Sequence, residues 1–174
     1  MTMLLSRPAA DEYNAYYDRY ITKVPDGDIV QILATQIAST LQLLESIPES
    51  KGDYRYAEGK WTVKESVLHV IDAERIFGYR ALRIARGDKT PLPGFEQDDY
   101  VPFSRAGERT VRDIAEELGD VRRSSVALFA HLDEEAMSRR GTASNNPVTP
   151  RALAYIIAGH ERHHVAILRE KYLS

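Results

Sequence analysis

Three of the chain's five histidines lie within ten residues, in the segment GHERHHVAIL at 159–168. This segment follows the apolar run LAYIIA and itself ends in the apolar residues VAIL, a context typical of a buried helix. At about 100° of rotation per residue, His160 and His164 fall on the apolar stripe of such a helix, whereas His163 falls at its edge. Imidazoles four residues apart on one helix face can both reach one cation, so this pair predicts a metal site.

A third candidate ligand is His69, in the segment ESVLHVIDAER. The apolar residues of this segment define the buried side of a second helix, and His69 flanks that side, so its ring can face inward. A catalytic metal usually has three protein ligands and leaves one position open. The alternative is that each histidine is a core residue whose nitrogens bind backbone carbonyls. His131 is expected at the end of another helix, where an imidazole interacts favourably with the helix C-terminus, and it is not counted as a ligand.

Two carboxylates, Glu74 and Glu161, are candidates for a supporting role around the metal. Both fall on or beside the apolar stripes of their helices, and a carboxylate in a core must be paired or hydrogen-bonded. Orienting a metal-bound imidazole is one way to satisfy it. Arg75, Arg80 or a tyrosine hydroxyl are the alternative partners. Asp72 falls toward the exposed side and is expected to be a solvated charge.

Four segments show the i, i+3, i+4 spacing of apolar residues that indicates amphipathic helices, and none shows the sustained alternation of a strand. The sequence therefore predicts an all-α fold. Thr62 and Glu65 have the spacing of a capping box, and Pro150 after Thr149 marks a helix start. A short helical piece is also expected at DEEAM. The expected long helices span about 28–46, 62–86, 110–131 and 150–172.

A connection of more than 20 residues, 87–109, separates the second and third of these helices. It contains three prolines and three glycines and is too long for a tight antiparallel turn, so it predicts a four-helix bundle with a long crossover. Its segment PLPGFEQDDY could form a pocket wall or a packed connector. We expect one domain over 1–174, with an N-terminal arm at 1–27 and the helical bundle at 28–172. The tyrosines of the arm are expected to serve packing or a dimer contact.

Composition limits the classes of function. The 174 residues include 23 basic and 26 acidic side chains, for a net charge of -3, and no long basic tract. Neither nucleic acid nor an anionic membrane surface is therefore favoured as a partner. We identify no signal peptide and no apolar stretch of about 18 residues, which leads us to expect a cytoplasmic protein. Cysteine is absent, so a metal would have nitrogen and oxygen ligands. Imidazole suits zinc, nickel, copper or iron.

Three segments also resemble a known family. YRYAEGKWTVKESVLHVIDAER, PLPGFEQDDYV and RALAYIIAGHERHHVAIL are similar to segments of the DinB-like (DinB/YfiT-like) superfamily of metal-dependent enzymes. The resemblance covers about 28–172. It implies a four-helix bundle with a long crossover, a frequent homodimer, and a divalent metal held by three histidines. Carried onto this sequence, those ligands are His69, His160 and His164.

The resemblance leaves the reaction open. Some members of the superfamily are similar to thiol S-transferases or isomerases that use low-molecular-weight thiols, and others resemble hydrolases. A dication on three histidines can lower the pKa of a bound thiol or of a bound water. Our first expectation is a thiol S-transferase-like enzyme acting on a small molecule, with the thiol supplied by a cosubstrate. The alternatives are a metal-dependent hydrolase and a non-enzymatic metal-binding or structural dimer.

Overall fold

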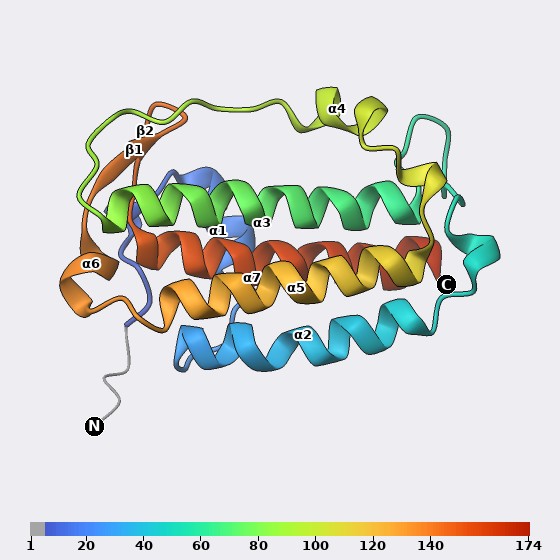
Figure 1. Ribbon diagram of the computed structural model, residues 1–174, viewed down its shortest axis with the longest axis horizontal. Helices are drawn as coiled ribbons and strands as arrows, with labels where there is room; N and C mark the ends of the chain where they lie inside the picture. The colour runs from blue at the N-terminus through green and yellow to red at the C-terminus, as the bar shows by residue number, and fades with distance from the viewer. Residues whose placement is uncertain (1–5) are drawn as a thin grey trace.

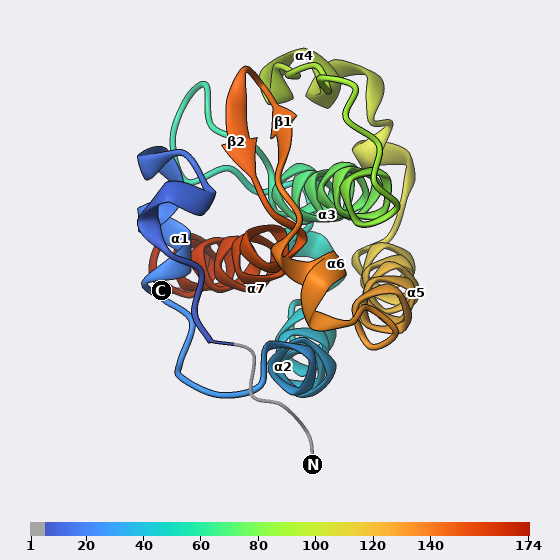
Figure 2. The ribbon, with the colours of Figure 1, turned by 90° about the vertical axis from the view of Figure 1, so that its left-hand side faces the viewer.

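The computed structural model describes residues 6–174 and shows a mostly helical protein in which four long helices lie side by side (Figure 1). Viewed nearly end-on, the helices occupy the corners of a bundle (Figure 2). In this bundle α3 packs against α7 and α5, and α2 packs against α5 and α7. The predicted four-helix bundle is confirmed. The long helices are α2 (Ile29–Glu45), α3 (Val63–Ala85), α5 (Val111–Phe129) and α7 (Pro150–Ile167).

Side-chain caps fix where the long helices begin. Thr62 accepts a hydrogen bond from the backbone N–H of Glu65, and the Glu65 carboxylate accepts one from the N–H of Thr62, as the predicted capping box requires. Thr149 caps α7 ahead of Pro150. Asp28 caps α2 in the same manner. These caps satisfy backbone N–H groups that the first helical turn leaves without partners, which explains the close agreement with the predicted starts.

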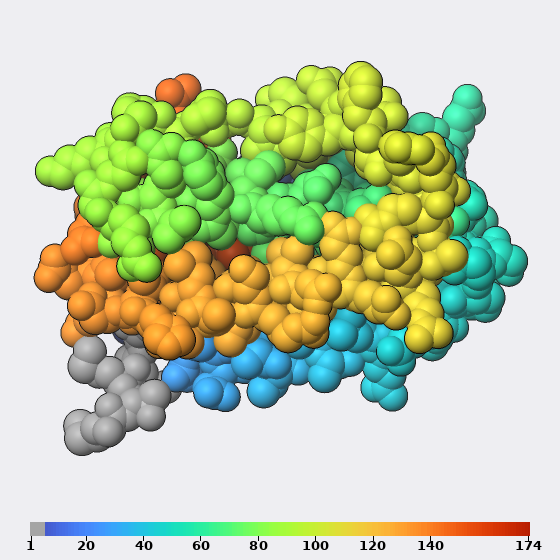
Figure 3. Space-filling view, viewed as in Figure 1, coloured from blue at the N-terminus to red at the C-terminus, as the bar shows by residue number. Residues whose placement is uncertain are grey.

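The connection from α3 to α5 runs along the outside of α3 (Figure 1). It contains the short helix α4 (Gln97–Tyr100) and the 3-10 turns Val101–Phe103 and Ala106–Glu108. In the space-filling view this crossover spreads over the edge of the bundle that α3 forms (Figure 3). The chain therefore has the long crossover that the sequence predicted.

A two-stranded hairpin between α5 and α7 was not predicted. After α6 (Glu134–Ser138), the strands β1 (Gly141–Ala143) and β2 (Asn146–Val148) pair antiparallel. The crossover adds to this hairpin, because the N–H of Leu92 donates to the carbonyl of Thr142 at 2.9 Å. Strands of three residues are too short to show a period of two, which is why the sequence did not predict them; the fold is otherwise helical, as expected.

The N-terminal arm packs against α7. Its described part contains the 3-10 turns Ala10–Glu12 and Ala15–Tyr17 and the short helix α1 (Asp18–Ile21). The first five residues of the expected arm at 1–27 lie outside the described residues. Glu12 fastens the arm, since its carboxylate accepts hydrogen bonds from Thr149 and from Arg151, both at the start of α7.

The C-terminal end of the chain closes over the start of α3. A π-helical turn, Leu168–Tyr172, continues α7. The hydroxyl of Tyr172 donates a hydrogen bond of 2.7 Å to the carbonyl of Trp61, just before α3 begins. Between residues 6 and 174, no helix is both long enough and apolar enough to cross a lipid bilayer.

Candidate metal centre

Three histidines from two packed helices converge inside the bundle. His69 on α3 meets His160 and His164 on α7, and one ring nitrogen of each lies within 4.8 Å of the other two. The Nε2 atoms of His69 and His160 are 3.0 Å apart. His69 and His160 are buried and His164 is half-buried. The structure thus brings together the three side chains that the sequence predicted as metal ligands.

Aromatic side chains surround the histidine rings and fix their orientation. The ring of Trp61 lies 4.8 Å from that of His69, measured between centroids. Tyr20 of α1 packs edge-on against His160 at 5.1 Å, and Phe77 does so at 6.2 Å. Such contacts limit rotation about the side-chain bonds, so the ring nitrogens are held facing one another.

Burial keeps the three imidazoles neutral. Loss of hydration lowers the pKa of His69 to about 4 and that of His164 to about 3, and it lowers the pKa of His160 well below its ordinary value. The neighbouring histidines add to the effect at His160 and His164, while the charge of Asp98 opposes it at His69. Neutral imidazole is the form that binds a metal.

The cluster fits a divalent cation. Two imidazole nitrogens on a tetrahedral zinc ion lie about 3.3 Å apart, given Zn–N distances of 2.0–2.1 Å. The separation of 3.0 Å between Nε2 of His69 and Nε2 of His160 is close to this value. The donor set is nitrogen throughout, which suits zinc, nickel or iron. Three such donors leave a further coordination position for a small ligand.

The remaining histidines lie outside the cluster, as predicted for His163 from its helical phase and for His131 from its place at a helix end. His163 is half-buried at the edge of α7, with its ring 5.3 Å from that of Tyr20. His131 is exposed near the end of α5, and its Nδ1 lies 2.8 Å from the carbonyl of Ala127. Asp72 differs from the expectation of a solvated charge. It is half-buried on α3, and burial raises the pKa of its carboxyl group.

Glu74 is paired with an arginine from a third helix, Arg122 of α5, which was not among the partners expected from the sequence. Nε and Nη2 of Arg122 each donate to the Glu74 carboxylate at 2.9 Å. The proposed partners were wrong, because Arg75 instead pairs with Glu117 on the surface. A signal was present in the sequence: Arg122 lies on the same helical stripe as the buried apolar residues of α5.

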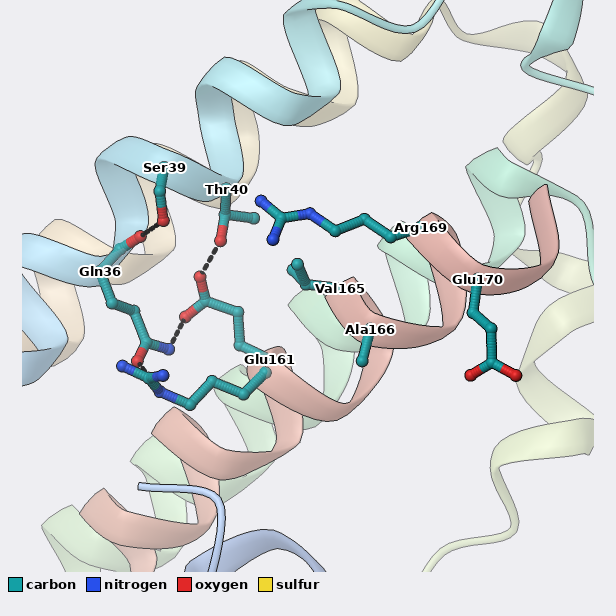
Figure 4. Close-up of a pocket in the computed structure, with 9 residues that line it drawn as sticks. Gln36, Ser39, Thr40, Glu161, Val165, Ala166, Arg169 and Glu170 are labelled. Atoms are coloured by element: carbon teal, nitrogen blue, oxygen red, sulfur yellow. Dashed lines mark hydrogen bonds between the residues drawn. The ribbon is translucent and has the colours of Figure 1, made fainter. Parts of the chain in front are cut away.

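Arg122 also pairs with Glu161, the residue after His160, at 2.7 Å. Both side chains are about 1% exposed, so the ion pairs are enclosed by the bundle. Glu161 accepts further hydrogen bonds from Gln36 and Thr40 of α2, which point toward it across a groove between α2 and α7 (Figure 4). This network links all four long helices.

The carboxylate network does not touch the histidine rings. Across residues 6–174, no hydrogen bond joins Glu74 or Glu161 to a ring nitrogen of His69, His160 or His164. The predicted role of these carboxylates in orienting a ligand histidine therefore stays a prediction without a direct contact to support it. Their observed partner is the arginine.

A pocket of about 290 Å³ opens beside the histidine cluster. The crossover contributes Phe95 and Asp98, so it does form a pocket wall, the role that its sequence left undecided. Tyr16, Tyr17 and Tyr20 of the arm line the same pocket, a role that the sequence did not predict, whereas Tyr13 packs in the core as expected. Side chains from segments far apart in the chain meet here. The lining includes His69, His160, Tyr16, Tyr17, Tyr20, Ala73, Phe77, Phe95, Glu96, Gln97, Asp98 and Ser144.

The protein is thus a four-helix bundle with an outer crossover, and it carries a three-histidine cluster beside a pocket. The profile of the DinB superfamily matches residues 32–168. The chain belongs to this superfamily, as its motifs predicted.

Comparison with individual proteins agrees with this assignment. A protein of Oceanobacillus iheyensis named "Putative metal-dependent hydrolase OB0413" is 23% identical over 130 residues, which span 74% of each chain. The solved structure of YfiT from Bacillus subtilis, described as a probable metal-dependent hydrolase with an unusual four-helix bundle topology, superposes with a TM-score of 0.73. That match has 18% identity and covers 95% of this chain and 90% of YfiT.

A mycothiol-dependent maleylpyruvate isomerase has a similar fold. Its structure superposes with a TM-score of 0.65 at 11% identity. The match covers 83% of this chain and 61% of the isomerase. At this level of identity the likeness shows a shared fold.

Proposed function

We propose that His69, His160 and His164 hold one divalent metal ion and that the protein is a metal-dependent hydrolase acting on a small molecule. The observation that carries the proposal is the convergence of three neutral imidazole nitrogens beside a pocket. Hydrolysis replaces thiol transfer as the leading function, because two similar proteins have names that describe metal-dependent hydrolases.

The protein supplies the environment for that reaction. A bound dication would provide a Lewis acid and lower the pKa of water near it. Tyr20, Phe77 and Phe95 line the pocket with aromatic rings, and electrostatic interactions beside such apolar walls are stronger than in bulk water. Asp98 is a carboxylate in the same pocket and can accept a proton there.

Metal content tests the ligand assignment. Elemental analysis of protein purified without a histidine tag is expected to give about one metal ion per chain. Replacing His69, His160 or His164 by alanine is expected to remove it, whereas His163→Ala, on the same helix but outside the cluster, is expected to keep it. A wild-type protein that takes up neither zinc, nickel nor iron would make the histidines core residues and overturn the proposal.

Thiol transfer is the second candidate, and the fold shared with a mycothiol-dependent enzyme favours it. The chain has no cysteine, so a low-molecular-weight thiol would have to enter the pocket as cosubstrate. Assays of the metal-loaded protein with ester and amide substrates, beside assays with small thiols and an electrophilic acceptor, separate the two. Thiol consumption without ester or amide cleavage would reverse the order of the candidates.

A structural metal would have a different signature. If metal removal unfolds the chain and the metal-loaded protein turns over neither substrate class, the site stabilises the fold and the enzyme proposal fails. The structure favours an open site, because His69 and His160 line a pocket large enough for a small molecule.

A further inference from the structure

Arg80 of α3 is a buried cation that pairs with no carboxylate among residues 6–174. The residue is only 3% exposed. Its hydrogen bonds, from Nη2 to the carbonyl of Pro93 at 2.7 Å and to the hydroxyl of Ser144 at 3.1 Å, have neutral acceptors. These bonds satisfy donor groups but do not compensate the charge.

The other buried charges in the described part of the chain are compensated. Lys64 pairs with Asp53, and Arg122 pairs with Glu74 and Glu161. Glu12 pairs with Arg151 in the same way. An enclosed charge is unfavourable unless an opposite charge accompanies it, so Arg80 is an exception that needs a physical explanation.

The position of Arg80 beside the pocket explains its uncompensated charge. Its guanidinium carbon lies 5.9 Å from the ring centroid of Phe77 and 5.7 Å from that of Phe95, and both rings line the pocket beside the histidine cluster. Ser144, which accepts a hydrogen bond from Arg80, lines the same pocket. Arg80 also lies near the hydroxyl of Tyr17. Burial raises the pKa of this hydroxyl, and the positive charge of Arg80 opposes that increase. The guanidinium of Arg80 therefore adjoins the pocket, in contact with three residues that line it, Phe77, Phe95 and Ser144.

The pocket has two chemically different ends. His69, Ala73, Phe77 and Arg80 succeed one another on one face of α3, at intervals of four, four and three residues. The helix rises about 16 Å from the first of these residues to the last. The carboxylate of Asp98 lines the pocket together with His69. The positive charge of Arg80 acts on the other end.

We propose that Arg80, together with Ser144, binds the carboxylate of a small anionic substrate whose reacting group lies at the histidine cluster. The second half of this statement rests on the proposed function, and the first half stands without it. The planar guanidinium fork matches the geometry of a carboxylate. A single negative charge compensates Arg80, whereas a phosphate dianion would add a second charge to a pocket that already contains Glu96 and Asp98.

Calorimetric titration with 3-phenylpropionate and its neutral amide, 3-phenylpropanamide, tests this assignment on the full chain, as purified and after treatment with a chelator. The wild type is expected to bind the acid roughly 10- to 100-fold more tightly than the amide, the usual gain from a charged hydrogen-bonded pair. Arg80→Gln is expected to abolish that preference. The matched control is Arg19→Gln, an exposed arginine 4.1 Å from the ring of Tyr16, and it is expected to keep the preference.

Ser144→Ala provides a second variant in case Arg80→Gln does not fold. Ser144 is half-buried at the hairpin turn, and its loss is expected to weaken acid binding several-fold while leaving amide binding unchanged. Equal affinity of the wild type for acid and amide would overturn the proposal, as would full preference in both variants. Tighter binding of inorganic phosphate than of the acid would overturn the choice of carboxylate. If the protein takes up no metal but still prefers the acid, the proposed metal-dependent function is contradicted and the role of Arg80 is retained.

Discussion

Nε2 of His69 on α3 and Nε2 of His160 on α7 lie 3.0 Å apart although 91 residues separate them in the sequence. This distance suits two ligands of one cation, and it also suits a hydrogen bond in which one neutral imidazole donates to the other. Either arrangement requires at least one nitrogen without a proton. The low pKa values of the cluster satisfy that requirement at neutral pH.

The metal-free protein should lose stability as the pH falls below neutrality. The folded-state pKa values of His69 and His164, about 4 and about 3, lie below the ordinary value of 6.5. The unfolded chain therefore takes up protons first, and the free energy of unfolding decreases from about pH 6.5 downward. Urea unfolding at pH 7.5, 6.5 and 5.5 measures this, before most carboxylates titrate. A free energy of unfolding that does not change over that range would contradict the prediction. The control is His131→Gln, which removes an exposed histidine outside the cluster and is expected to keep the same pH dependence.

Removal of Arg122 should be costly. Arg122→Met leaves the carboxylates of Glu74 and Glu161 buried together without a cation, which is expected to lower the free energy of unfolding by about 3–5 kcal/mol. Arg123→Met, one residue further along α5 and largely exposed, is expected to cost less than about 1 kcal/mol. Urea unfolding compares the two. Similar stabilities for both variants would show that the buried network contributes little.

Two glycines in the middle of long helices should respond to alanine in opposite directions. A Cβ at Gly159 of α7 would collide with the backbone carbonyl group of Tyr20, so Gly159→Ala is expected to cost about 1–3 kcal/mol or more and to displace α1 from His160. A Cβ at Gly78 of α3 meets no atom within 4 Å, so Gly78→Ala is expected to stabilise by up to about 1 kcal/mol. Thermal unfolding of the two variants provides the measurement. A stabilised Gly159→Ala would contradict the close packing of α1 on α7.

Fluorescence should report metal binding, because Trp61 is the chain's one tryptophan and its ring lies 4.8 Å from that of His69. Titration with Ni²⁺ is expected to quench the emission in the wild type with a stoichiometry of about one per chain. The same titration is expected to leave His69→Ala unquenched and to quench His163→Ala fully. Equal quenching in all three proteins would indicate nonspecific binding and contradict the assigned ligands.

Local sequence patterns determined the helices and the phases of the histidines. Caps such as Thr62 and Thr149 act within one helical turn, so their effect can be read from neighbouring residues. The spacing of His160 and His164 fixes their shared face for the same reason. The hairpin at 141–148 was missed because its three-residue strands depend on pairing with each other and with Leu92 rather than on their own pattern.

The sequence by itself determined which residues could face the core, and the tertiary structure decided which of them meet. Helical phase places Glu74 and Arg122 on buried stripes, but only the packing of α3 against α5 makes them a pair. The approach of His69 to His160 likewise depends on the rotation and depth of α3 against α7. The pocket depends on two further segments, because the arm and the crossover must both fold over α3 to form it. Such contacts between distant segments depend on the whole packed core, and no short stretch of sequence contains them.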